Sequence, residues 1–108
     1  MGLRLQTTHF IIYLARLSDQ QAPRLGLAVS RQIGNAVARN RTKRRLRESF
    51  RRELKPMMLP ESALMIVARQ GAAQLRTQEV TAELKPALLR LVNRLKAAYG
   101  PGGKSQPS

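Results

Sequence analysis

Basic side chains gather in one short stretch of this sequence, where their type and spacing could do chemistry. Residues 31 to 55 carry ten of the twenty lysines and arginines but only two of the six acids. Arginine binds phosphate through two parallel hydrogen bonds, so a row of arginines suits a polyanion. At 100° per residue, one helix face would hold four residues spaced by four, three and four positions: Asn40, Arg44, Arg47 and Arg51.

Such a run of charge is often only a solvated helix face, but solvated helices mix charges of both signs to gain favourable pairs. Here nine cations occupy positions 39 to 55, and the whole chain has a net charge of +14. A charge of that size predicts a polyanionic partner. Fifteen of the cations are arginines, and no zinc-finger, homeodomain or leucine-zipper pattern is present. These features favour RNA over DNA as the partner.

Other residues that could do chemistry are sparse. The acids are scattered, and only Glu79 and Glu83 would share a helix face. Cysteine is absent and His9 is the single histidine, which excludes disulfides, cysteine-ligated metals and histidine clusters. A nuclease that does its own chemistry needs clustered carboxylates or a general acid and base, so this reading has little support. With no membrane-length apolar run and no signal core, we expect a cytoplasmic protein without a membrane partner.

Three segments are predicted to be strands. Residues 8–17 are rich in β-branched and aromatic side chains, and residues 24–30 follow after a short link, which predicts an antiparallel relation between the two. Residues 63–69 form a nearly continuous apolar run, typical of a strand that is covered on both faces.

Two segments are predicted to be helices. Residues 36–54 lack glycine and proline, and Asn35 is a good N-cap for them. Residues 77–99 carry an apolar stripe of helical period, but Pro86 should kink this helix or delay its start. The resulting β-β-α-β-α order predicts an α+β fold, a small two-layer sandwich with a mixed sheet. Residues 1–99 would form a single RNA-binding domain, and residues 100–108 a flexible C-terminal tail.

A longer pattern appears where the basic stretch begins. It runs from the second strand into the first helix without a gap, and it resembles the bacterial ribonuclease P protein subunit. The family motif is matched by Gly26, Val29, Ser30, Gly34, Ala36, Arg39, Asn40, Arg41, Lys43, Arg44 and Arg47. The likeness extends to the first strand and to residues 63–73, and it covers roughly residues 7 to 98.

The resemblance implies a function in tRNA maturation. The family's protein is a small partner of a large catalytic RNA, expected at one copy of each, and the complex removes the 5′ leader of precursor tRNA. Magnesium ions held mainly by the RNA would drive the hydrolysis, and no cofactor is expected on the protein alone. The implied fold is that of the second domain of ribosomal protein S5, with a left-handed β-α-β crossover instead of the usual right-handed one.

The resemblance also assigns roles to residues, with no catalytic residue and no metal ligand in the protein. The catalytic RNA would be bound by Arg31, Arg39, Asn40, Arg41, Lys43, Arg44, Arg47 and Arg51. The leader would lie in a cleft over the sheet, with Tyr13, Phe10 and Ser30 as candidate contacts. On an alternating strand Phe10 and Tyr13 fall on opposite faces, so at most one faces the cleft. The family match favours Tyr13, and Phe10 fits the core better.

The sequence departs from the family pattern in three places. Few residues precede the first strand, so the family's N-terminal helix is expected to be missing, and we expect weaker leader recognition with strong RNA docking. Thr42 replaces an aliphatic residue of the motif, and Pro86 interrupts the last helix. The competing hypothesis is a general RNA-binding or ribosome-associated protein that has no processing role.

Overall fold

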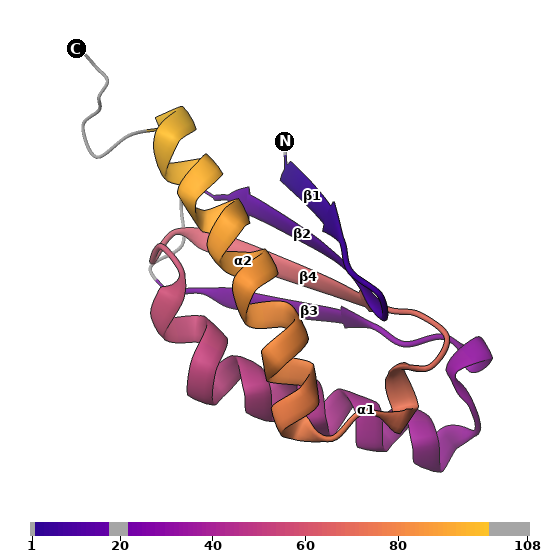
Figure 1. The fold of residues 1–108 in the computed structure, drawn as a ribbon. Coiled ribbons are helices and arrows are strands. Elements are labelled where there is room, and N and C mark those ends of the chain that lie inside the picture. The colour runs from indigo at the N-terminus through magenta and orange to yellow at the C-terminus, as the bar shows by residue number, and fades with distance from the viewer. Residues whose placement is uncertain (1, 18–21, 100–108) are drawn as a thin grey trace.

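The computed structural model describes residues 2–17 and 22–99, and these residues form one four-stranded sheet with helices on one side (Figure 1). The expected tail at 100–108 lies outside the described residues. No helix in the described part of the chain is long and apolar enough to span a membrane. The strands, in sheet order β1-β2-β4-β3, are β1 (Gly2–Gln6), β2 (Phe10–Arg16), β4 (Ser62–Ala68) and β3 (Arg24–Ala28).

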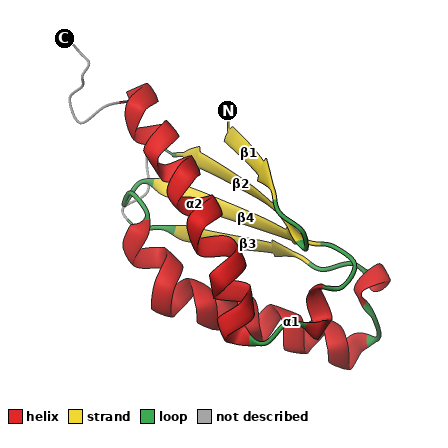
Figure 2. Ribbon diagram, viewed as in Figure 1, coloured by secondary structure: helices red, strands yellow, loops and turns green. Residues whose placement is uncertain are grey.

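Two long helices account for most of the remaining residues. They are α1 (Ala36–Ser49) and α2 (Thr77–Tyr99), and both cover the same face of the sheet (Figure 2). A π-helical turn continues α1, and a 3-10 turn that contains a proline follows it. Short 3-10 turns also precede α1 and α2. The four turns are η1 (Arg31–Ile33), η2 (Phe50–Leu54), η3 (Lys55–Met57) and η4 (Ala72–Gln74).

The sheet is mixed, as the sequence predicted. Strand β2 pairs antiparallel with β1 and with β4, whereas β3 pairs parallel with β4. The chain passes from β3 through α1 to β4 on the helical side, and this crossover is left-handed (Figure 1). Parallel strands need such a long connection, so the basic helix is also the element that joins the two parallel strands.

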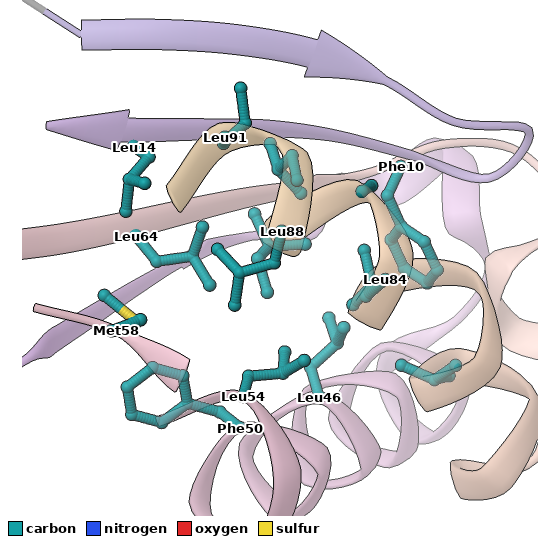
Figure 3. Packing of buried hydrophobic residues seen from close by; sticks show 14 of the residues in the cluster. Phe10, Leu14, Leu46, Phe50, Leu54, Met58, Leu64, Leu84, Leu88 and Leu91 are labelled. Carbon is teal, nitrogen blue, oxygen red and sulfur yellow. The ribbon is translucent and has the colours of Figure 1, made fainter. Parts of the chain in front are cut away.

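The core lies between the sheet and the helices (Figure 3). Alternate residues of β2 and β4 point into it, because successive side chains of a strand face opposite ways. The helices close the core with their leucine stripes. The largest fully buried side chains are Phe10, Ile12, Leu14, Leu46, Leu54, Leu64, Ile66, Val80, Leu84, Leu88, Leu91 and Leu95.

Three expectations about the strands need correction. The residues before β2 form β1, a strand that the sequence did not predict. Strands β2 and β3 do run antiparallel, but β4 lies between them. Strand β4 is covered on one face only, since Leu64 and Ile66 are buried while Met65 is 42% exposed. An apolar run in a strand therefore does not show that both of its faces are covered.

The predicted helices agree with the structure better than the predicted strands do. The predicted helix 36–54 spans α1 and the π turn, with its bounds confirmed but its last turn widened. Helix α2 begins at Thr77 and continues past Pro86, so the proline does not delay its start. Pro86 lies on the exposed side of α2. Packing of the opposite, leucine-rich side stabilises the helix despite the hydrogen bond that a proline removes.

Candidate nucleic-acid interface

Side chains at both ends of the sheet-to-helix connection hold the start of α1 in place. The Ser30 hydroxyl accepts a hydrogen bond from the Gln32 amide at 3.3 Å, and Asn35 Oδ1 accepts one from the Ala38 amide at 2.9 Å. Both are N-cap contacts that satisfy otherwise unpaired amides. Asn35 is therefore a cap, as predicted, and Ser30 also has a structural task. Ser30 and Arg31 are exposed where the chain enters α1.

The inner side of α1 is anchored by small and apolar residues. Leu46 is fully buried, and Ser49 forms a 2.5 Å hydroxyl–hydroxyl hydrogen bond with Thr81 of α2. Thr42 is 2% exposed and donates its hydroxyl proton to the Ala38 carbonyl at 2.8 Å. The threonine is therefore tolerated in this buried position because its polar atom is satisfied inside the helix.

The outer side of α1 and of the π turn η2 that continues it is the basic face, and its exposed residues are Asn40, Arg44 and Arg47 on α1 and Arg51 on η2. The predicted spacing therefore does place these four side chains on one solvent-facing row. Among the described residues, the acids nearest in sequence are used elsewhere: Glu48 lies 3.9 Å from Arg52, and Glu53 pairs with Lys85 at 3.0 Å. The positive potential along the row is thus left for an external anion.

The remaining motif cations flank this row. Arg39, Arg41 and Lys43 are half-buried. The Nε atoms of Arg39 and Arg41 are buried and have no hydrogen-bond partner among the described residues. A buried donor without a partner is costly, so this arrangement destabilises the start of α1 to some extent.

Arg45 has a role that the sequence did not reveal. Its Nη1 donates a 2.6 Å hydrogen bond to the Leu75 carbonyl, which ties α1 to the loop before α2. Arg45 therefore stabilises the packing of α1 against this loop. No pattern in the sequence distinguishes it from its neighbours, because its partner is a backbone carbonyl 30 residues away.

The sheet surface opposite the helices is the second candidate surface, and we call it the open face. The strand register assigns to it, besides two glycines, the side chains of Arg4, Gln6, Ile11, Tyr13, Ala15, Arg24, Ala28, Ala63, Met65 and Val67. These residues include no carboxylate. Tyr13 is 37% exposed here, whereas Phe10 is fully buried on the other face. Phe10 as a leader contact is therefore wrong, because strand alternation turns its ring into the core.

A shallow groove of about 320 Å³ lies on the open face. Tyr13 and Met65 form part of its wall, Gly26 leaves space on β3, and Arg24 supplies a cation. On the other side of Tyr13, the Arg4 guanidinium carbon lies 6.0 Å from the centroid of the tyrosine ring. Arg4, Arg24 and Met65 are candidate contacts that the sequence pattern did not indicate. The alternation of β1 could have suggested Arg4, but the strand was not recognised.

The turn between β1 and β2 is fastened to α2 by Glu83. Its carboxylate accepts hydrogen bonds from Thr7 Oγ1 at 2.5 Å and from the His9 amide at 2.6 Å, and it lies 2.7 Å from His9 Nδ1. Burial by itself raises the pKa of Glu83, but the hydrogen bonds from His9 and Thr7 outweigh it and lower the pKa overall. His9 is thus a structural residue of the turn.

The described carboxylates show no arrangement for metal-dependent hydrolysis. Glu79 accepts a hydrogen bond from the Arg76 amide at the start of α2, and Glu61 lies 3.7 Å from Arg16. Glu79 and Glu83 share a helix but serve different structural contacts. Within residues 2–17 and 22–99, no three histidine or acidic side chains come together in a way that could hold a metal ion.

Comparison with protein families gives a match over most of the chain. A family model described as ribonuclease P matches residues 1–92. A ribonuclease P protein component from Syntrophobacter fumaroxidans is 40% identical over 95 residues, which cover 88% of this chain and 79% of the relative. The corresponding component from Geobacter is 41% identical over 88 residues, covering 82% and 73% of the two chains.

Solved structures agree with the sequence matches. The RNase P protein from Thermotoga maritima superposes with a TM-score of 0.72 at 28% identity, covering 82% of this chain and 83% of the other. The RNase P protein from Staphylococcus aureus gives a TM-score of 0.69 at 27% identity, with 88% and 82% covered. The fold and the left-handed crossover expected from the motif are those of this structural group.

Proposed function

The chain belongs to the ribonuclease P protein family, and from that premise we propose how its two surfaces divide the work of tRNA processing. As a ribonuclease P protein component, it is the partner of an RNA subunit. We propose that the basic face of α1 docks on that RNA and that the open face of the sheet holds the 5′ leader of precursor tRNA. One copy of the protein per RNA subunit is enough for this arrangement.

The exposed basic face supports the proposed docking on the RNA subunit. Asn40, Arg44, Arg47 and Arg51 are exposed along one helix side and have no described acidic partner. Phosphate contacts by such a row give affinity through the release of counterions. Arg39 and Arg41 lie half-buried beside it. The half-buried residues would contact the RNA together with the row, and Arg31 would extend the surface at its N-terminal end.

The composition of the open face supports the proposed binding of the 5′ leader. Single-stranded nucleic acid is commonly held by aromatic side chains on which bases stack, together with nearby cations. Tyr13 is the exposed aromatic residue of this face, and it lies between Arg4 and the groove beside Arg24. Ser30 lies two residues after the end of β3 and is exposed before α1, and we propose that it contacts the leader there.

The proposed contribution of the protein to hydrolysis is binding. Each described carboxylate has a structural partner, and none of them lies with two others in a group suited to a metal ion. We propose that the magnesium ions are held mainly by the RNA subunit and that the protein brings the substrate to them. The chemistry would then depend on no single side chain of this chain.

Reconstitution tests this function. The chain would be added to the catalytic RNA and a precursor tRNA, and 5′ cleavage measured at low magnesium concentration. We expect cleavage with the chain and little without it, since the cationic side chains of the bound protein offset the repulsion between RNA phosphates. A chain that binds the RNA tightly but leaves cleavage unchanged would favour the alternative, a general RNA-binding protein.

A further inference from the structure

One line of residues crosses the open face from edge to edge. The strand register places Arg4 of β1 opposite Tyr13 of β2, Tyr13 opposite Met65 of β4, and Met65 opposite Gly26 of β3. These four residues, which we call the central rung, thus present a guanidinium, an aromatic ring, a thioether and a vacant position in order. Neighbouring strands are about 4.8 Å apart, so the rung extends over about 14 Å.

We propose that Arg4 is a substrate-positioning residue: its guanidinium stacks on Tyr13 and binds a phosphate of the single-stranded leader, while a leader base stacks on the exposed part of the central rung. This inference rests on the proposed function of the open face. It assigns the outer boundary of the leader site to β1, a strand that the motif does not include. The ligand is single-stranded RNA, recognised by base planes and backbone phosphates.

The position of Arg4 supports a contact with phosphate. The side chain is exposed on an edge strand, and the open face includes no carboxylate that would neutralise it. Its guanidinium donates a hydrogen bond to the neutral amide oxygen of Gln6, at the long distance of 3.5 Å. The guanidinium carbon is 6.0 Å from the Tyr13 ring centroid, within the range of a cation–π contact. Arginine can stack through its plane and still donate hydrogen bonds at its edge.

The other end of the rung supports stacking. A Cβ atom placed on Gly26 would lie 3.0 Å from Met65 Cε and 3.2 Å from its sulfur, so the methionine side chain lies over the glycine. Met65 is 42% exposed and Tyr13 is 37% exposed, which leaves a continuous surface for a base. Arg24, on the same edge strand as Gly26, lines the groove and offers a second cation on the far side. Two arginines thus flank an apolar strip.

A simpler role for Arg4 must be separated from this one. Charged residues on edge strands discourage pairing between copies of a chain. That role requires a positive charge but not a planar group, and it does not depend on the leader. Lysine therefore distinguishes the two, because it retains the charge and stacks less well on an aromatic ring.

The experiment uses the reconstituted complex of chain and catalytic RNA. The affinity of this complex is measured for precursor tRNA with a leader and for the same tRNA without one. The ratio of the two affinities is the leader preference. We expect Arg4→Gln to lower the preference about 5- to 10-fold and Arg4→Lys to lower it less. The salt dependence of the leader contribution should also flatten by about 0.7, the loss of one single-strand phosphate contact. Arg90→Gln, an exposed cation on α2, is the matched control and should change neither quantity.

The outcomes distinguish a failure of the role proposed for Arg4 from a failure of the proposed function. An unchanged leader preference in Arg4→Gln, with a loss in Tyr13→Ala, would overturn the role of Arg4 and leave the proposed function intact. Equal losses in Arg4→Gln and Arg90→Gln would also overturn it, since net charge alone would explain them. A leader preference in Arg4→Lys equal to that of the parent chain would refute stacking by the guanidinium. Absence of any stimulation by the parent chain would contradict the proposed function itself. Thermal melting of each variant alone shows whether β1 remains folded.

Discussion

The basic face and the open face of the sheet, the two surfaces proposed to bind RNA, differ in composition. The basic face holds three arginines and an asparagine without an aromatic residue, whereas the open face has a tyrosine and a methionine between two separated arginines. The former offers charge, which binds any phosphate backbone, and the latter offers stacking surface, which requires unpaired bases. We therefore expect affinity for folded RNA and selection of a single strand to be separate properties of this domain.

The two surfaces also differ in how they are supported. α1 is fixed by caps at its start, by buried Leu46 and by the Arg45 contact to Leu75. The outer part of the open face depends on β1, an edge strand whose turn is fastened by Glu83 from the other side of the molecule. Changes that loosen β1 should therefore impair leader binding before RNA docking.

The largest effect is expected from removing charge on α1. The triple substitution Arg44→Ala, Arg47→Ala and Arg51→Ala should weaken binding of the catalytic RNA strongly. The slope of log K against log salt should flatten by roughly two to three units, about one per phosphate contact. Filter-binding titrations over a range of salt concentrations measure both. An unchanged slope would show that these arginines do not touch phosphate.

The next effect concerns the open face. Tyr13→Ala should reduce the preference for precursor over mature tRNA by about 1–3 kcal/mol, the usual value of one base–aromatic stack. Affinity for the catalytic RNA itself should not change, and Tyr13→Phe should retain the preference because the ring remains. If Tyr13→Ala weakened RNA docking as much as leader binding, the division between the two surfaces would be incorrect.

A stability effect should follow from Glu83. Its folded-state pKa is lowered by the hydrogen bonds from His9 and Thr7, so its contribution is present above pH of about 4.5 and is lost as pH falls through the lowered pKa. Glu83→Gln should reduce the free energy of unfolding at neutral pH by about 1–3 kcal/mol and weaken its dependence on acid pH. Denaturant titrations at several pH values test this. The same pH dependence in both proteins would contradict the assignment.

A smaller effect is expected at Asn40. Alanine is the better helix former, so Asn40→Ala should leave α1 as stable or raise its stability by about 0.5 kcal/mol. Binding of the catalytic RNA should nevertheless fall a few-fold, because the exposed amide is lost from the basic face. Parallel measurements of unfolding and RNA affinity separate the two. Unchanged affinity would restrict the docking surface to the cations.

No effect on chemistry is expected from the acids. The double variant Glu53→Gln and Glu61→Gln removes two surface carboxylates that have only exposed ion pairs, and such pairs add little stability. Cleavage at saturating protein and fixed magnesium should stay within a few-fold of the parent. A loss of about 10²-fold or more, typical of a missing general acid or base, would restore the hypothesis of a protein nuclease.

The sequence predicted the parts of the molecule that local patterns determine. Helical spacing placed Asn40 and Arg47 on one exposed side, and strand alternation separated Phe10 from Tyr13. The parallel pairing of β3 with β4 was also expected, because a long helix lies between them. These features depend on residues close together in the chain, where period and propensity are informative.

The missed features depend on pairing and tertiary contacts that the propensity of a single segment does not show. β1 has five residues, and pairing with β2 stabilises it, so its own propensity gives little indication. The contact of His9 with Glu83 joins residues 74 positions apart, and that of Arg45 with Leu75 joins residues 30 apart. Without β1, the position of Arg4 beside Tyr13 does not follow from the sequence pattern.

Site-directed crosslinking tests the division between the two surfaces most directly. The chain has no cysteine, so Arg51→Cys on the basic face and Gln6→Cys on the open face each give one site for a photoreactive group. In the complex with catalytic RNA and precursor tRNA, we predict that position 51 crosslinks to the catalytic RNA and position 6 to the 5′ leader. Crosslinks from both positions to the same RNA, or an exchange of the two targets, would contradict the account.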